Sequence, residues 1–153
     1  MSLKDEMENL IEAKRKDLES DDLKEKKETE LQYNAFQPMC IKLKEIFSSI
    51  EPKYFILTIE KTCATIKLGR DKKNVDDFRE SLGELFIAPR GEHKDLGNGI
   101  EFHLLPGFLV HARDLDGPTR HTFETEDAVT NHLIPIIAEA VAYLRHHDEK
   151  FKN

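Results

Sequence analysis

The chain has 153 residues, 35% of them charged and 39% hydrophobic, and a formal net charge of −7. Its size predicts one ordinary domain with an appendage. The acidic balance argues against a nucleic-acid binder, which needs a basic face, and against an anionic membrane surface as partner. The sequence shows no apolar run long enough to span a bilayer and no secretion signal, and its two cysteines have no CxxC spacing. We therefore expect a cytoplasmic protein.

A highly charged helical arm is predicted for residues 1–50. Its first thirty residues contain seven Lys/Arg and eleven Asp/Glu, after a capping-box-like start at Ser2 and Asp5. Apolar residues recur at helical spacing, fade across residues 19–30 and then resume: Leu3, Met7, Leu10, Ile11 and Leu18, then Phe36, Met39, Leu43, Ile46 and Ile50. Pro38 predicts a break or kink near residues 34–38, with a helix from there to about Ser49.

Two packing arrangements are open for this arm. It could fold back onto its own domain as a helical hairpin, or it could form an intermolecular coiled coil. A helix with so few apolar residues in its first thirty cannot bury much by itself. Because most soluble oligomers are two-fold dimers, we expect a homodimer that forms through the arm. Another protein could also dock on it.

From Tyr54 the apolar period changes from 3.6 to 2, which indicates strands. Alternation over 55–59 and 64–68 predicts a hairpin with an even loop around Lys61-Thr62 and the pairs 59:64, 57:66 and 55:68. Asn74 can cap a short helix that directs Val75, Phe78, Leu82 and Leu85 inward. Residues 85–88 are then expected to form a strand that Pro89 stops, followed by a loop over 90–98.

Residues 99–113 are predicted to form a second hairpin with a loop of three or five residues around Pro106-Gly107. Either odd loop length puts the same residues on one face: Ile100, Phe102, Leu104, Val110 and Ala112. The other face then carries Glu101, His103, His111 and Arg113. His103 would oppose His111, and Glu101 would oppose Arg113.

The last segment is predicted to contain a turn over 114–118, a strand over 119–124 and a C-terminal helix. The sequence does not determine the register of this strand. Thr125 is the expected N-cap, and Glu126 and Asp127 suit the positive end of the helix. Its buried stripe is expected to be Val129, Leu133, Ile136, Ile137, Ala140 and Leu144, with a kink or a start at Pro135.

The hairpin face of Glu101, His103, His111 and Arg113 is the one candidate binding site. Two histidines and a carboxylate can bind a divalent ion, and histidine can transfer protons. The competing interpretation is a solvated sheet face with one cross-strand ion pair, and we favour it because no third ligand has a fixed spacing. We therefore predict no metal and no cofactor. Cys40 and Cys63 are expected to be small buried hydrophobes, and Asp114 with Asp116 suits a turn better than a calcium loop.

Together these patterns predict an α+β fold: an arm over 1–50 and a domain over 51–153 with a mainly antiparallel sheet of five or six strands. The C-terminal helix is expected to pack on one sheet face. The leading hypothesis is a non-enzymatic, oligomeric protein-interaction module. The alternatives are a metal- or His-dependent enzyme that uses the face around His103 and His111, and a small-ligand binder with a pocket between the sheet and the C-terminal helix.

Overall fold

A computed structural model describes residues 2–114 and 117–151, and it places a five-stranded sheet between two helices in chain order. The long helix α1 (Leu3–Phe47) is followed by the short 3-10 helix η1 (Pro52–Tyr54). The strands are β1 (Phe55–Ile59), β2 (Ala64–Asn74), β3 (Asp77–Asp95), β4 (Ile100–Arg113) and β5 (Thr119–Phe123), and α2 (Glu126–Lys150) closes the fold. The sheet is an antiparallel meander in the order β1-β2-β3-β4-β5, so the predicted α+β class is confirmed.

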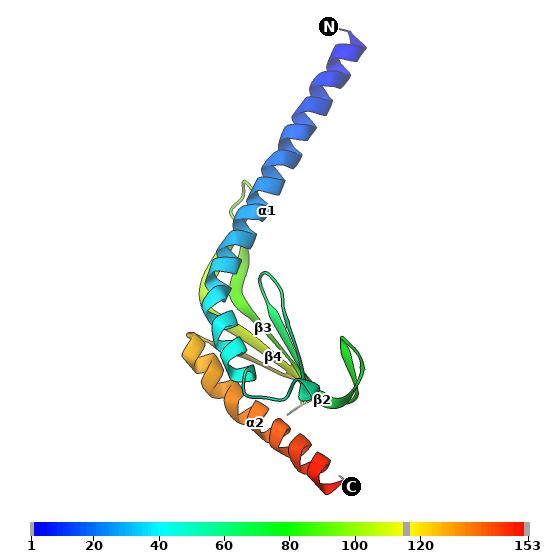
Figure 1. Ribbon diagram of the computed structural model, residues 1–153. Coiled ribbons are helices and arrows are strands. Elements are labelled where there is room, and N and C mark those ends of the chain that lie inside the picture. The colour runs from blue at the N-terminus through cyan, green and yellow to red at the C-terminus, as the bar shows by residue number, and fades with distance from the viewer. Residues whose placement is uncertain (1, 115–116, 152–153) are drawn as a thin grey trace.

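The arm is one helix of 45 residues, about 68 Å long at 1.5 Å per residue. The Ser2 hydroxyl caps it by accepting a hydrogen bond from the Asp5 amide at 3.2 Å. Of the break or kink predicted near residues 34–38, the break is wrong, because the helix runs through Pro38. Figure 1 shows instead that the helix bends where its colour passes from blue to cyan. Pro38 and Asn34 are exposed, so the carbonyl that loses its helical partner stays open to water.

One core joins both helices to one face of the sheet. From α1 it takes Phe36, Met39, Cys40, Leu43 and Phe47, so it extends across the expected domain boundary at residue 50. From α2 it takes most of the predicted stripe, with Val141 in addition and Ile136 only half-buried. The strands contribute inward residues at alternate positions: Ala64, Ile66, Leu68, Leu85, Ile87, Phe108, Val110 and Ala112. The second apolar stripe of the arm therefore packs on its own domain.

The β1–β2 hairpin has the register that the alternation predicts. Ile59 pairs with Ala64, Leu57 with Ile66 and Phe55 with Leu68, and the Glu60 amide donates to the Cys63 carbonyl across the loop at 2.8 Å.

The predicted helix after Asn74 is wrong, because β2 and β3 form a hairpin there. Asn74 pairs with Asp77, and the Asn74 side-chain oxygen accepts from the Asp76 amide at 2.9 Å. Asn therefore caps a turn in this chain and not a helix. The strand expected over 85–88 is part of the 19-residue β3, which continues past Pro89 and through most of the predicted loop. Pro89 is tolerated because the ladder is already interrupted there by a register shift between Pro89 and Gly91.

The predicted hairpin over 99–113 is also wrong, because these residues form the single strand β4. Phe108 pairs with Pro89 and Leu104 with Gly91, so residues 105–107 bulge out of the ladder opposite Arg90. Gly107 has φ +95°, and a Cβ there would lie 2.0 Å from the Phe123 carbonyl oxygen. The Pro-Gly pair thus makes a bulge that lets β5 approach, not a chain reversal.

The last segment agrees with the sequence where the structure describes it. β5 pairs with β4 in the register Phe108–Phe123, Val110–His121 and Ala112–Thr119, which the alternation could not set. The Thr125 hydroxyl accepts from the Ala128 amide at 3.1 Å and caps α2, which passes through Pro135 without a break. The centre of the predicted turn, residues 115 and 116, lies outside the described residues, and so does the Asp116 carboxylate.

Candidate functional site

The four residues of the predicted binding face lie on one face of the sheet but not opposite each other. All four are odd-numbered residues of β4, whose even-numbered residues Phe108, Val110 and Ala112 belong to the core. His103 pairs with Glu92 and Glu101 with Lys94, whereas His111 pairs with Phe86 and Arg113 with Glu84. The β3 partners of His103 and His111, Glu92 and Phe86, are six residues apart, so the two histidines lie about 20 Å apart at 3.3 Å per residue. One small ligand or ion therefore cannot bridge the two histidines.

Glu101 and His103 are the only pair of this set that the structure brings together among the described residues. The His103 Nε2 atom lies 3.5 Å from a Glu101 carboxylate oxygen. That nitrogen is shielded from solvent and makes no hydrogen bond to the residues that the structure describes. His121 of β5, another histidine of the sheet, points to the helix side with its ring 5.2 Å from the ring of His132. No group of three or more His, Cys, Asp or Glu within residues 2–114 and 117–151 could hold a metal ion.

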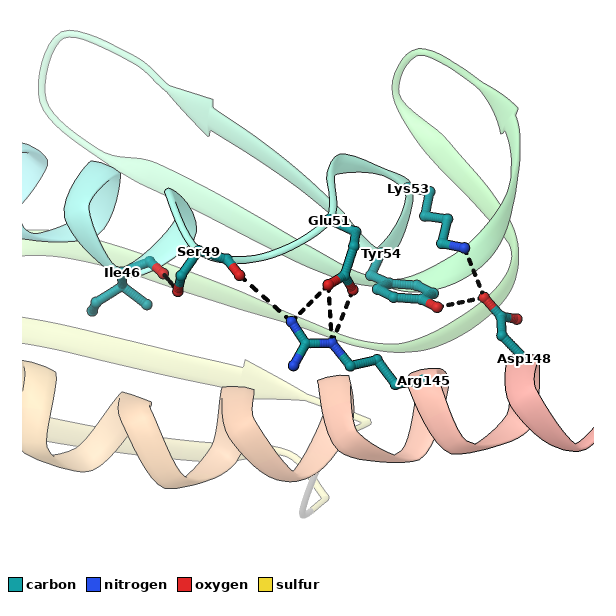
Figure 2. A network of polar contacts seen from close by, with 7 residues as sticks. All are labelled: Ile46, Ser49, Glu51, Lys53, Tyr54, Arg145 and Asp148. Carbon is teal, nitrogen blue, oxygen red and sulfur yellow. Dashed lines mark hydrogen bonds and ion pairs between the residues drawn. The ribbon is translucent and has the colours of Figure 1, made fainter.

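A polar network fastens the C-terminal half of α2 to the segment that joins α1 to the sheet (Figure 2). The Arg145 guanidinium donates to both carboxylate oxygens of Glu51, at 3.0 Å from Nε and 2.7 Å from Nη2, and to the Ser49 carbonyl at 3.5 Å. The Tyr54 hydroxyl donates to Asp148, whose carboxylate also lies 3.1 Å from Lys53 Nζ. Such bidentate and charge-assisted bonds fix geometry more than they create reactivity.

The charges of this network are mutually stabilised. The hydrogen bond from Arg145 lowers the pKa of Glu51, and the hydrogen bonds from Tyr54 and Lys53 lower the pKa of Asp148. Burial, followed by the bond to Asp148, raises the pKa of Tyr54. Every charged group in the network therefore has a partner of its own, which is the pattern of a structural clamp.

Neither cysteine has the surroundings of a nucleophile. Cys40 is 4% exposed in the core, and burial raises its pKa. Cys63 is half-buried 3.4 Å from a Glu60 carboxylate oxygen, and burial with this hydrogen bond raises its pKa to about 11. A thiol with a raised pKa is a poor nucleophile at neutral pH because little thiolate is present.

A groove of about 660 Å³ runs between the facing flanks of α1 and α2. Aliphatic side chains including Ile46, Ile134 and Ile137 line it, with Lys42 and Arg145 among its polar residues. Its size is that of a small-ligand pocket, but Lys42 is paired with Asp127 at 3.0 Å and Arg145 with Glu51. It lies between the two helices, and not between the sheet and α2 as the sequence suggested.

The N-terminal part of α1 carries the largest set of exposed apolar side chains on one element. Residues 2–27 are all exposed, and Glu28 is the first residue of the helix that is partly buried. Figure 1 shows this part as a straight rod that projects beyond the sheet. The exposed fractions are 83% for Leu3, 58% for Met7, 63% for Leu10, 56% for Ile11 and 63% for Leu18.

These five side chains form a stripe, which we call the arm stripe. At 3.6 residues per turn they lie in a sector about 100° wide, and Phe36, Met39, Leu43, Ile46 and Phe47 lie in the same sector. The arm stripe therefore continues the helix face that packs on the sheet, but beyond the end of the sheet.

Comparison of the chain with protein-family models, with curated proteins and with solved structures finds no match. No helix of the described residues is long and apolar enough to cross a membrane.

Sequence reasoning missed the clamp and the groove. Glu51 and Arg145 are 94 positions apart, as are Tyr54 and Asp148, and no local sequence pattern predicts either contact. The arm stripe did have a signal, the recurrence of leucines at helical spacing.

Proposed function

We propose that this protein is a non-enzymatic interaction module that self-associates through the arm stripe. The observation that carries the proposal is the exposure of Leu3, Met7, Leu10, Ile11 and Leu18 on one face of a helix that projects from its domain. A soluble chain gains free energy when such a row of apolar side chains is buried against a partner. The absence of a match among known proteins leaves the geometry as the support for the proposal.

The two parts of the 45-residue helix have different surroundings, and this difference supports the proposed function. Its C-terminal part is fixed in the core by Phe36, Met39 and Leu43, all 0% exposed. Its N-terminal part has a mainly polar surface, and apart from Leu23 its large apolar side chains all belong to the arm stripe. An isolated helix of this kind is marginally stable in water, so continuity with the anchored part and contact with a partner both favour it.

Light scattering on the full-length chain and on a chain that begins at Lys26 tests the proposal. This truncation removes the arm stripe but keeps the core residues of α1, whereas a truncation near Tyr54 would remove part of the core. We expect the full-length protein to be a dimer at tens of micromolar and the shorter chain to be a folded monomer.

A point variant with a matched control sharpens this test. Leu10→Glu places a charge in the arm stripe and should shift the protein to monomer. Leu23→Glu alters a side chain of similar exposure, 55%, that lies on the opposite side of the helix, and should leave the dimer intact. A full-length monomer, or equal loss in both variants, would contradict assembly through the arm stripe.

A further inference from the structure

We propose that the partner of the arm is a second copy of the same arm, paired antiparallel in one register in which residue i lies beside residue 31−i. The two-fold axis then passes between Arg15 and Lys16. This inference rests on the proposed function, and it adds the identity of the partner, its direction and the contacts that select it.

The charges along the seam disfavour a parallel, in-register pair. The positions that continue the arm stripe at alternating steps of four and three are Leu3, Met7, Leu10, Lys14, Asp17, Asp21 and Lys24. In a parallel, in-register pair each of these positions meets its own copy. Lys14 and Lys24 would then face lysines, and Asp17 and Asp21 would face aspartates, at four successive layers.

The antiparallel pair in which residue i lies beside residue 31−i removes all four like-charge contacts. It sets Lys24 beside Met7 and Asp21 beside Leu10. Lys14 of each copy then lies beside Asp17 of the other, so the central layers form two ion pairs. At the flanking positions, where antiparallel helices bring like heptad positions together, Lys4 approaches Glu25 and Glu6 approaches Lys27. On the same flank as the Lys4–Glu25 pair, Ile11 of each copy meets Leu18 of the other, so these two residues of the arm stripe contact each other.

Other antiparallel registers with the same seam are worse. A shift of one heptad toward the domain pairs Lys14 with Lys24 and Asp17 with Asp21, which are like charges. A shift of one heptad the other way forms no ion pair along the seam. Among these arrangements, charge complementarity therefore favours the register in which residue i lies beside residue 31−i.

The free length of the arm fits this register. Residues 2–27 are exposed, and Glu28 is the first residue to contact the sheet, with its carboxylate 3.7 Å from His93 Nε2. In the proposed pair Leu3 of one copy lies level with Glu28 of the other. Each arm therefore ends where the β3–β4 hairpin of its partner begins. The exposed Leu96 and Ile100 lie at that hairpin tip.

Charge-reversed full-length chains of unchanged net charge test the register. The first variant carries Lys4→Glu with Glu6→Lys, and the second carries Glu25→Lys with Lys27→Glu. In either variant alone, four opposite-charge pairs of the dimer become like-charge pairs. Sedimentation equilibrium at low salt should show a dissociation constant raised by at least about tenfold.

An equimolar mixture of the two variants restores every one of these pairs, and so does the chain that carries all four substitutions. We expect both to dimerise as tightly as the original chain, with helical content unchanged by circular dichroism. If each variant alone dimerises normally, or if the mixture stays weak, the register is overturned while self-association stands. If the original chain is a monomer up to about 100 µM, the proposed function itself fails.

Discussion

Gly107 shows how one residue decides the path of the backbone. It has φ +95°, and a side chain there would meet the Phe123 carbonyl, so the position requires both a left-handed backbone and the absence of a Cβ. Gly97 has a similar φ of +84° in the β3–β4 turn, but open space surrounds it. The two glycines therefore separate the cost of backbone strain from the cost of close packing.

We predict that Gly97→Ala lowers the free energy of unfolding by about 1 kcal/mol, the usual cost of a positive φ for alanine. Gly107→Ala should lower it by about 3 kcal/mol or more, because the β4–β5 pairing must also shift. Urea denaturation of both variants measures the difference. Equal losses would show that β5 does not approach β4 as closely as the bulge requires.

At the scale of elements, the clamp of Glu51, Lys53, Tyr54, Arg145 and Asp148 holds α2 beside the entry to the sheet. Its two carboxyls have lowered pKa values in the folded protein. Near pH 4 these carboxyls bind fewer protons in the folded protein than in the unfolded chain. They therefore stabilise the fold fully at pH values above the pKa that they have in the unfolded chain. This stabilisation is lost as the pH falls through the lowered pKa values of the folded protein.

We predict that the thermal midpoint falls as the pH is lowered from about 5 to about 3, the range in which these carboxyls are protonated. Glu51→Gln with Asp148→Asn should lower the midpoint at pH 7 and flatten its dependence on pH in this range. Glu149→Gln, a neighbouring carboxyl on α2, serves as the control. An equally steep acid limb in the double variant would assign the acid sensitivity to other groups.

The two parts of α1 should respond differently to the same chemical change. Leu43 is 0% exposed and Leu10 is 63% exposed. We predict that Leu43→Ala lowers the free energy of unfolding by about 3 kcal/mol, the usual cost of a buried leucine. Leu10→Ala should change the unfolding of the dissociated monomer by less than about 0.5 kcal/mol. Similar losses would mean that the N-terminal part also belongs to the folded core.

The sequence predicts an element well where two strands are joined by a short loop and only one face is apolar. For β1 and β2 the alternation allows one parity, and the observed pairs match it. In β4 the same argument fails, because a hairpin with an odd loop and a continuous strand place the same residues on each face. Pro106-Gly107 then favoured a turn, and nothing local indicated that β3 would extend far enough to pair with all of β4.

The candidate site was predictable to a smaller extent. Glu101, His103, His111 and Arg113 do share a face, because this depends only on parity, but their predicted opposition depended on the hairpin and is wrong. The clamp depends on tertiary contacts between residues such as Glu51 and Arg145, which no periodicity encodes. The arm stripe was visible in the sequence because an isolated helix displays its pattern directly.

At the scale of the whole molecule, an anchored domain holds a rod about 40 Å long, residues 2–27, away from the sheet. The rod carries an apolar stripe in line with the core and charges that match those of a reversed copy. We predict that these features assemble two domains at opposite ends of a paired arm. In such a dimer the outer sheet faces, with Glu101 and His111, remain open to further partners.

The distance between spin labels on the two copies tests this claim most directly. Labels at Arg15, beside the two-fold axis, should lie within about 20 Å of each other. Labels at Asp5 should lie about 33 Å apart, because the proposed register separates them by about 21 residues of helix rise. A similar distance at both positions would indicate parallel arms, and the absence of dipolar coupling at micromolar concentration would contradict self-association through the arm.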